Sequence, residues 1–538
     1  MELRLAQPSD APKWVELFKL CYGNDYPYKQ IYDPVYVSSI LDPASGDQTL
    51  LVVNGDDIRA SITLLSCDEF TNNPVINLAR PLFHPESYQE GSAKGLIHQL
   101  CEIAKENKNF VVTRVPVYDA EQQGLFEDCG FKCVGYQPNK HLVNTHKGFL
   151  FYVLKNPDII GQRMVVSGSL SQVGAIAMAV FENFGIVNRI LIRDNIAGYP
   201  LETEYEIVEA TGEEFQIFKL QSMTKNWMPE ISTGANRGHG FLRLSSNTPV
   251  RAYLGREVKG SETKVLAGIT YFYDDIDKCI RILDGFSNDD ITLGALLQKV
   301  VNTAREKYSA AYVEIDILAI SPMLLKCAEQ IGFTPVAYFP GFYRVGEHVS
   351  DVVKMVKINV NYEPEKYQHS EQTFRIAKII DDNFRDQKTG VAIINLLRTL
   401  PVFRGLGDGE LRKISKVFVQ KLYRPGEIIF KQGAPGEEAY VVMRGQVDIC
   451  LSAETKPIAS IKTGQVFGEQ AFLDGSPRTA MAVATQPSIL LIVRRDEFTR
   501  LMQREPNLGM VIMRNIAIDL SNKLRMANRT IMERKQVK

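Results

Sequence analysis

The stretch FGEQAFLDGSPRTAMAVA, from Phe467 to Ala484, decides the fold of the C-terminal part of this chain. We expect a short helix embedded between strands. The first N–H groups of a helix lack partners within it, so a helix start beside a guanidinium forms an anion site. Arg478 is placed to supply that guanidinium. Glu469 would repel a phosphate and is better explained as an acceptor for a sugar hydroxyl. Phosphate beside sugar indicates a nucleotide.

Short β-branched stretches cut by glycines surround this segment between Phe418 and Val493. Glycine supplies turn conformations that other residues resist, so this rhythm is typical of a small antiparallel barrel or jelly roll. The glycines are Gly426, Gly433, Gly436, Gly445, Gly464, Gly468 and Gly475. Helical segments are predicted on both sides of the barrel.

The segment resembles the phosphate-binding cassette of the cyclic-nucleotide-binding domain family, FGE-x-x-L-x(n)-R-[TA]-A, and the resemblance covers roughly 140 residues. It implies that Arg478 pairs with the cyclic phosphate and that Glu469 accepts the ribose 2′-hydroxyl. The implied site is completed by Gly468, Gln470, Ala471, Thr479 and Ala480. Thr479 is compatible with cGMP, but cAMP-binding relatives also carry threonine there, so the effector is cAMP or cGMP. The alternative is a decayed cassette with Arg478 salt-bridged on the surface.

After the barrel, an apolar stripe at helical spacing predicts helices. It consists of Leu508, Val511, Ile512, Ile516, Leu520 and Leu524. In the family such helices close over the base, but core packing or a homodimer contact fits the stripe equally well. No helix-turn-helix follows, which argues against a DNA-binding regulator.

Composition sets broader limits. A chain of 538 residues is expected to hold about three or four domains. Its net charge of −1 gives no general attraction to nucleic acid or acidic membranes. The eight cysteines are scattered, and the pair Cys129 and Cys133 lacks the further ligands of a zinc site, so we expect no metal. No run of about 18 apolar residues predicts a membrane span, and no signal peptide is evident, which favours a cytoplasmic protein.

The N-terminal half alternates strands and helices, which predicts an α/β fold. It resembles the GNAT acetyltransferase family in the loop YQEGSAKGLI and in LFEDCGFKCVGY, from Leu125 to Tyr136. The resemblance implies that acetyl-CoA is bound by Gln89, Gly91, Ser92 and Ala93, where small residues let backbone N–H groups approach a pyrophosphate. Two positions depart from the family: Tyr88 stands where Gln or Arg is usual, and Phe126 replaces a tyrosine that protonates the leaving thiolate. Catalytic residues, including the general base, stay unassigned.

A second lobe repeats this pattern, with CAEQIGF from Cys327 standing where LFEDCGF stands in the first. Its loop has only Gly294 and carries Asp289 and Asp290, which would repel a pyrophosphate, and Ala328 occupies the tyrosine position. We therefore expect this lobe to be a structural or substrate-shaping partner. The stretch SMTKNWMPEISTGANRGHGF before it is a candidate substrate-facing loop, and a plain surface connection is the alternative.

The predicted architecture is two α/β GNAT-like lobes followed by a β-barrel (jelly-roll) cyclic-nucleotide-binding domain with flanking helices. The predicted boundaries are lobe 1 at 1–155, a bridging segment at 156–215, lobe 2 at 216–360, a helical linker at 361–394 and the sensor at 395–538. The leading hypothesis is a GNAT-type N-acetyltransferase, acting on a small amine or a protein lysine and gated by cAMP or cGMP through the linker. The rival hypothesis is a non-catalytic, nucleotide-responsive scaffold.

Overall fold

The structure is a computed structural model that describes residues 2–24, 26, 28–66, 75–106, 110–141, 147–154, 156–166, 168–188, 190–194, 196–222, 229–232, 249–260, 262–288, 292–360, 362, 370–415, 417–451, 456–518, 521 and 525. The chain divides into two compact units, Met1–Phe384 and Arg385–Lys538. In the described part, none of the helices combines the length and the apolar character needed to cross a bilayer.

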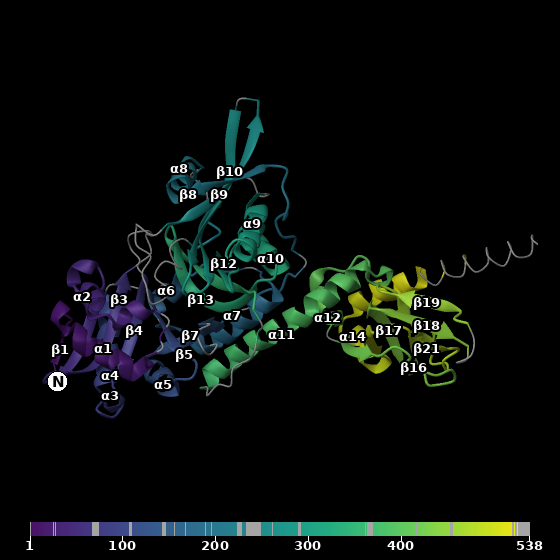
Figure 1. The fold of residues 1–538 in the computed structure, drawn as a ribbon, viewed down its shortest axis with the longest axis horizontal. Coiled ribbons are helices and arrows are strands. Elements are labelled where there is room, and N and C mark those ends of the chain that lie inside the picture. Colours follow the sequence, from purple (N-terminus) through teal and green to yellow (C-terminus); the bar gives the residue numbers. More distant parts are fainter. Residues whose placement is uncertain are drawn as a thin grey trace, which may run out of the picture. The chain divides into compact units, whose positions relative to one another are not determined.

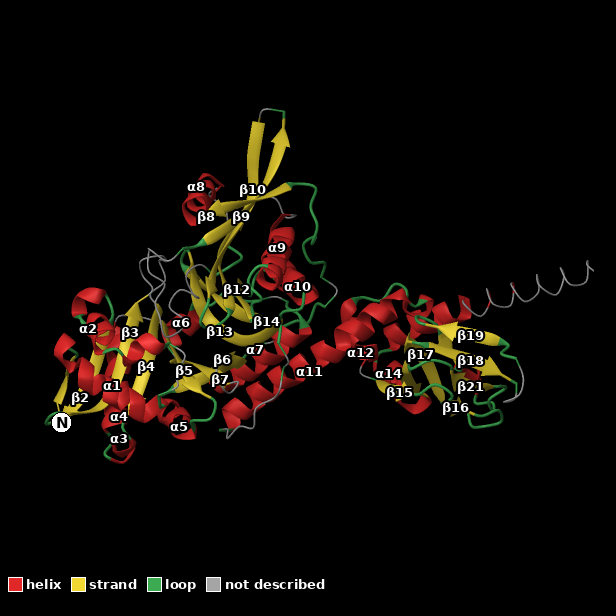
Figure 2. Ribbon diagram, viewed as in Figure 1, coloured by secondary structure: helices red, strands yellow, loops and turns green. Residues whose placement is uncertain are grey.

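The first unit is built on one 14-stranded sheet (Figures 1 and 2). Its first half contains β1 (Glu2–Leu5), α1 (Ala11–Tyr22), α2 (Pro34–Leu41), β2 (Gln48–Asn54), β3 (Asp57–Ser66), β4 (Val75–Phe83), α3 (Pro85–Gln89), α4 (Ser92–Glu106), β5 (Phe110–Pro116), α5 (Ala120–Asp128), β6 (Phe131–His141) and β7 (Lys147–Leu154). Its second half contains β8 (Glu206–Thr211), α8 (Gly212–Ser222), β9 (Arg251–Lys259), β10 (Glu262–Asp274), β11 (Cys279–Ser287), α9 (Thr292–Glu306), β12 (Tyr312–Leu318), α10 (Pro322–Gln330), β13 (Thr334–Val345) and β14 (His348–Ile358).

The two halves have the same strand order. The first runs β1-β2-β3-β4-β5-β7-β6, and the second, read from its outer edge, runs β8-β9-β10-β11-β12-β14-β13. Each half has one parallel pair, β4 with β5 and β11 with β12, and a helix connects the two strands of each pair. The internal duplication predicted from the CAEQIGF and LFEDCGF stretches is therefore present as a repeated topology, and we call the halves the first and second repeat.

The repeats join where β6 pairs with β13 through Gly135 and Ala337. A Cβ placed at Gly135 would lie 2.2 Å from the Cβ of Ala337, which is too close for two carbon atoms that are not bonded to each other. Glycine is thus required at this position for the two half-sheets to form one sheet.

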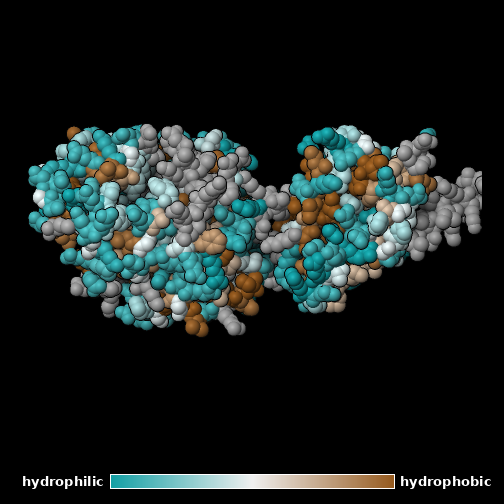
Figure 3. All heavy atoms as spheres, turned by 90° about the horizontal axis from the view of Figure 1, so that it is seen from below, coloured by the Kyte–Doolittle hydropathy of each residue, from teal (hydrophilic) through white to brown (hydrophobic). Residues whose placement is uncertain are grey.

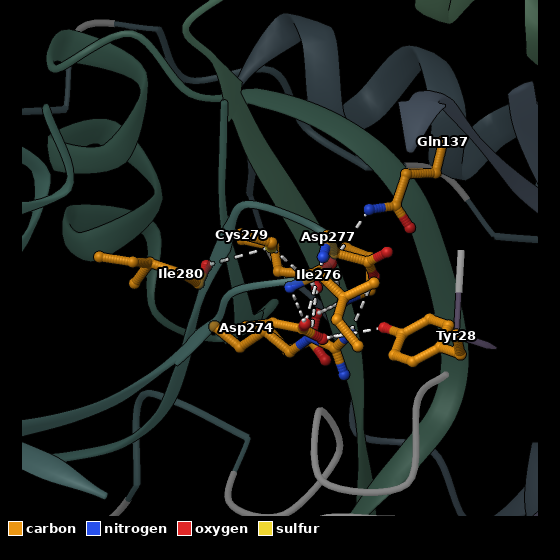
Figure 4. Close-up of polar contacts among 11 residues, drawn as sticks. Tyr28, Gln137, Asp274, Ile276, Asp277, Cys279 and Ile280 are labelled. Atoms are coloured by element: carbon orange, nitrogen blue, oxygen red, sulfur yellow. Dashed lines mark hydrogen bonds and ion pairs between the residues drawn. The ribbon is translucent and has the colours of Figure 1, made fainter. Parts of the chain in front are cut away.

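A buried polar cluster also lies where the repeats meet (Figure 4). Tyr28 of the first repeat donates a 3.0 Å hydrogen bond from its hydroxyl to Asp274 of the second, and Gln137 Nε2 donates to Glu314 at 3.0 Å. Arg281 pairs with Asp274 at 3.1 Å and with Glu314 at 3.2 Å. Because Asp274 and Glu314 each face the Arg281 guanidinium and accept a further hydrogen bond, the cluster can stay buried and fix how the repeats pair.

The segment between the repeats differs from the expected bridge. It contains α6 (Pro157–Gly161) and α7 (Ser171–Phe184), but β8 belongs to the second repeat because it pairs antiparallel with β9. The predicted boundary at residue 215 falls inside α8, and the predicted boundary at 394 falls inside α11 (Glu371–Thr399). Local composition did not distinguish a bridging strand from a sheet-edge strand.

One ion pair fixes the bridging segment to the second repeat. Arg163 donates to both carboxylate oxygens of Asp351, at 2.7 and 2.5 Å, and Asp351 also accepts from the Tyr338 hydroxyl at 2.6 Å. The Arg163 side chain is 7% exposed and that of Asp351 is 0% exposed. Removing one partner of such a pair leaves a buried charge without its counter-ion.

Arg163→Ala should therefore lower the free energy of unfolding of the first unit by about 3–5 kcal/mol. Both tryptophans of the chain, Trp14 and Trp227, lie in that unit, so tryptophan fluorescence during urea unfolding reports on it alone. Arg305→Ala is the control, because that side chain is 74% exposed, and it should change the midpoint little. Equal midpoints for the two variants would contradict the structural role given to Arg163.

The second unit contains two four-stranded sheets, β15-β22-β17-β20 and β16-β21-β18-β19, as expected for the predicted jelly roll. Its elements are α12 (Asp408–Ser415), β15 (Phe418–Tyr423), β16 (Ile428–Phe430), β17 (Glu438–Arg444), β18 (Gln446–Cys450), β19 (Ala459–Lys462), β20 (Val466–Phe467), α13 (Glu469–Asp474), β21 (Met481–Ala484), β22 (Ser488–Arg494) and α14 (Arg495–Arg504), preceded by the end of α11.

Candidate functional site

The candidate site is built around the turn from β20 into α13. Gly468 precedes the helix with φ of +74°, a conformation that favours glycine. A Cβ at this position would also lie 2.8 Å from Nη1 of Arg478. That guanidinium donates to the carbonyl of Gly468 at 2.9 Å and to the carbonyl of Glu438 at 2.6 Å. The predicted glycine and arginine are thus in direct contact.

Among the described residues, Arg478 is a buried cation without an anionic partner. The residue is 4% exposed, and no described carboxylate forms an ion pair with it. Its Nε is buried without a hydrogen-bond partner in the described part of the chain. Burial lowers the pKa of this guanidinium below its usual value. A buried guanidinium without a counter-ion is stabilised by an anion, so this geometry fits the phosphate role predicted for Arg478. The burial of Arg478 contradicts the surface salt bridge of the decayed-cassette alternative.

Two aromatic rings that the sequence analysis did not single out hold the guanidinium in place. Its carbon lies 4.2 Å from the ring centre of Phe430 and 5.7 Å from that of Tyr440. Phe430 ends β16 and Tyr440 lies in β17, so both rings come from outside the cassette. Cation–π contacts of this kind orient arginine while leaving its N–H groups available.

Arg495 is a second residue that the sequence analysis missed. It donates to the carbonyls of Phe472 at 2.7 Å, Ala471 at 2.5 Å and Gly436 at 2.8 Å. Because these carbonyls lie at α13 and in the turn before β17, Arg495 fixes the far end of the cassette helix. The only signal in the sequence is its place in the RRDEF stretch after β22, which does not distinguish it from Arg494.

Glu469 is half-buried at the first position of α13. It lines an apolar cavity of about 410 Å³ whose wall also includes Phe472, Ala439 and Val441. Ala439 and Val441 alternate with Tyr440 along β17, so this cavity lies on the opposite face of the strand from the ring beside Arg478. The ribose role of Glu469 stays a prediction.

The other predicted cassette residues lie around the same turn. Ala471 and Ala480 are buried, at 5% and 7% exposure, and Gln470 and Thr479 are exposed. The Thr479 carbonyl accepts from Gln432 Nε2 at 3.2 Å, and the contact of the Thr479 hydroxyl with a base stays a prediction.

The apolar stripe after the barrel packs into the core of the second unit. Residues 506–518 are helical, and Leu508 and Ile512 are 2% and 0% exposed. Met510 and Met513 are exposed on this helix, and apolar side chains gather on the face of this unit seen in Figure 3. Leu520 and Leu524 lie outside the described residues. Core packing is confirmed for part of the stripe, and the homodimer stays a prediction.

The residues predicted to bind acetyl-CoA lie at the start of α4. The predicted loop YQEGSAKGLI is a turn between two helices: its first residues end the short helix α3, which Pro85 begins, with the His84 side chain accepting from the N–H of Glu86, and its last residues belong to α4. Gln89 therefore ends a helix, Gly91 takes φ of +76°, and Ser92 and Ala93 open α4. Phe126 is buried between Phe83 and Phe131.

Most of the candidate loop SMTKNWMPEISTGANRGHGF lies outside the described residues, including Trp227, Gly234, Gly238 and Gly240, as do Asp289 and Asp290. Cys129 and Cys133 are buried free thiols. Burial raises their pKa values to about 11 and about 12, so both stay protonated at neutral pH.

Comparisons with known proteins identify a known domain family within the second unit. Residues 420–505 match the family described as the cyclic nucleotide-binding domain. The chain is similar to the cyclic AMP receptor protein of Thermus thermophilus, with 33% identity over 131 residues, which is 24% of this chain and 59% of that protein. It is also similar to cGMP-dependent protein kinase, isozyme 1, of Drosophila melanogaster, with 31% identity over 115 residues, 20% of this chain and 15% of that one.

Among solved structures, the Thermus thermophilus catabolite activator protein is 31% identical, with a TM-score of 0.23 over 24% of this chain and 61% of that one. The chain thus spans less than two thirds of the length of these relatives, and the family match at residues 420–505 lies in the second unit.

Proposed function

We propose, from the premise that residues 420–505 form a cyclic nucleotide-binding domain, that this domain regulates an acyl-CoA-dependent N-acetyltransferase formed by the two repeats. In this proposal, cAMP or cGMP binds at Arg478 and Glu469. The first repeat binds acetyl-CoA and transfers its acetyl group to a small amine or a protein lysine.

The observation that carries the regulatory part is the packing of α11. Its first half contributes Ile376, Ala377, Ile380 and Phe384 to the core of the first unit. Its last half contributes Ile393, Ile394 and Leu397 to the core of the second unit. In this proposal α11 links nucleotide binding to the state of the repeats, because each of its halves packs in one of the two cores.

The start of α11 is also fixed to the helix that carries Phe126. Ser370, just before α11, donates to Glu127 at 2.7 Å, and the same carboxylate oxygen accepts from the Tyr152 hydroxyl at 2.9 Å. Arg375 pairs with Glu182 of α7. A displacement of α11 would thus reach α5, next to the position where the resemblance places the catalytic tyrosine.

The acyltransferase part is supported by the start of α4. This helix lies between the parallel strands β4 and β5 in the chain, and ligands of open α/β sheets bind at the carboxyl ends of such strands beside the helix N-terminus. Cβ atoms placed at Gly91 or Gly95 would meet no described atom within 4 Å, so the first turn of α4 is open to a ligand. This arrangement fits a pyrophosphate at Gln89, Gly91, Ser92 and Ala93.

A specific observation favours the rival scaffold function. Phe126 has no proton to give a thiolate, and its burial among Phe83 and Phe131 keeps water from that position. A scaffold would bind nucleotide and change conformation without transferring an acyl group.

Thiol release from acetyl-CoA separates the two functions. The full chain is assayed with polyamines, amino acids and a lysine peptide, with and without cAMP or cGMP. We expect thiol release above the hydrolysis rate, changed about 5- to 150-fold by nucleotide, which corresponds to a coupling free energy of about 1–3 kcal/mol. Absence of both thiol release and acetyl-CoA binding would leave the scaffold.

A further inference from the structure

The second repeat has the framework of a ligand crevice. β11 and β12 pair only from Cys279 and Tyr312 to Arg281 and Glu314. Beyond these residues β11 stays paired with β10 and β12 with β14, so the two parallel strands separate. The carboxyl ends of separating parallel strands, with a helix N-terminus beside them, are a general site for anionic ligands. Here that helix is α9.

The chain's own backbone occupies this place. The N–H of Ser232 donates to the carbonyl of Asp316, and the N–H of Leu318 donates to the carbonyl of Glu230, both at 2.8 Å. Ile231 stands opposite Ile317 in an antiparallel bridge. Residues 230–232 thus take up the edge of β12 that β11 leaves free.

The Ile231 side chain reaches the other wall. It is 1% exposed, and a Cβ placed at Gly285 of β11 would lie 2.7 Å from its Cδ1 atom. Residues 230–232 therefore bond to one strand and pack on the other, and we call them the plug.

The N-terminus of α9 is covered as well. A Cβ placed at Gly294, in the first turn, would lie 2.4 Å from the carbonyl oxygen of Pro200 and 2.8 Å from the Cβ of Tyr199. The Tyr199 hydroxyl donates to Glu230 at 2.9 Å, so the cover of the helix is tied to the plug. Both the strand crevice and the helix start of this repeat are filled from within the chain.

The first repeat differs at the corresponding place. β4 and β5 separate after Leu78 and Thr113, and none of the isolated bridges between described residues involves β5. Between described residues, two side chains donate to carbonyls of β4 there: the Tyr22 hydroxyl to Pro81 at 3.2 Å and Cys21 Sγ to Phe83 at 3.5 Å. Side chains can rotate away from a ligand, whereas a paired backbone segment cannot.

We propose that the plug closes the second repeat to acyl-CoA, so that the chain has a single acyl-CoA site, in the first repeat. The identity of the ligand rests on the proposed function, but the occupation of β12 by the plug does not. The plug also gives a role to residues within the SMTKNWMPEISTGANRGHGF stretch, which fill a crevice of their own repeat.

Hydrogen exchange tests the plug itself. In the full wild-type chain the amides of Ser232 and Leu318 should exchange far more slowly than in unfolded peptides, because both are bonded within the plug. Ile231→Asp should speed their exchange at least about 10-fold, since a carboxylate is expelled from the apolar contact with Gly285. The matched control is Ile217→Asp, the same change on α8 at a side chain that is 54% exposed. Tyr199→Phe, which removes only the hydroxyl, should give a smaller increase.

Unfolded-like exchange of Ser232 in the wild type would overturn the plug. Calorimetry with acetyl-CoA then tests the number of sites: we expect one in the wild type and in Ile217→Asp, and a second in Ile231→Asp. Two sites in the wild type would also overturn the proposal. Absence of acetyl-CoA binding in every protein, with Ser232 protected, would reject acyl-CoA as the ligand and leave the plug in place.

Discussion

Arg478→Glu is expected to weaken cyclic nucleotide binding at least about 100-fold, which corresponds to roughly 2.7 kcal/mol. The wild-type guanidinium is buried, lacks a described ion-pair partner and is oriented by Phe430 and Tyr440. A carboxylate at this position would repel the phosphate and would lose the donors to Gly468 and Glu438. Calorimetric titration with cAMP and with cGMP measures the loss and also shows which purine is preferred.

Two further variants separate binding from folding. Arg478→Lys keeps the charge but not the forked geometry, and should bind with intermediate affinity. Arg494→Glu makes the same charge change at a side chain that is 59% exposed, and should bind nucleotide as the wild type does. Equal affinity of the wild type and Arg478→Glu would contradict the cassette assignment.

Gly390→Pro is expected to uncouple the two units while leaving nucleotide affinity within about threefold. Gly390 lies inside α11, between Phe384, which packs in the first core, and Ile393, which packs in the second. Proline removes a backbone hydrogen bond and clashes with the preceding turn, at a cost of about 3 kcal/mol, so the helix should break between its two anchored halves. Nucleotide should then leave amide exchange in the first unit and thiol release from acetyl-CoA unchanged.

Gly390→Ala is the matched control, because alanine favours the helix by about 1 kcal/mol relative to glycine. It should keep or strengthen the nucleotide response. A Gly390→Pro protein that responds to nucleotide as the wild type does would show that α11 is not the coupling element.

Much of the sensor could be predicted from the sequence because its signals are local. The left-handed turn before α13 requires a glycine, and Gly468 stands there. The arginine ten positions later returns to that turn, as the spacing of the cassette predicts. The rings beside Arg478 could not be predicted, because they come from β16 and β17 and depend on how the two sheets pack.

The duplication could be predicted from the sequence, but the extent of the second repeat could not. Repeated stretches such as CAEQIGF and LFEDCGF predict repeated topology, since each encodes a helix end and the strand that follows. The strand at 206–211 was assigned to a bridge because an exposed edge strand has the composition of a connection.

The sequence by itself determined the nucleotide cassette around Gly468 and Arg478 and the presence of two related α/β repeats, because turn conformation and periodicity act over a few neighbouring residues. Only the tertiary structure decided that Ile231 fills the second repeat and that α11 belongs to two cores. The physical reason is that these contacts join segments far apart in the chain, where strand register and close packing select the partner and no local preference does.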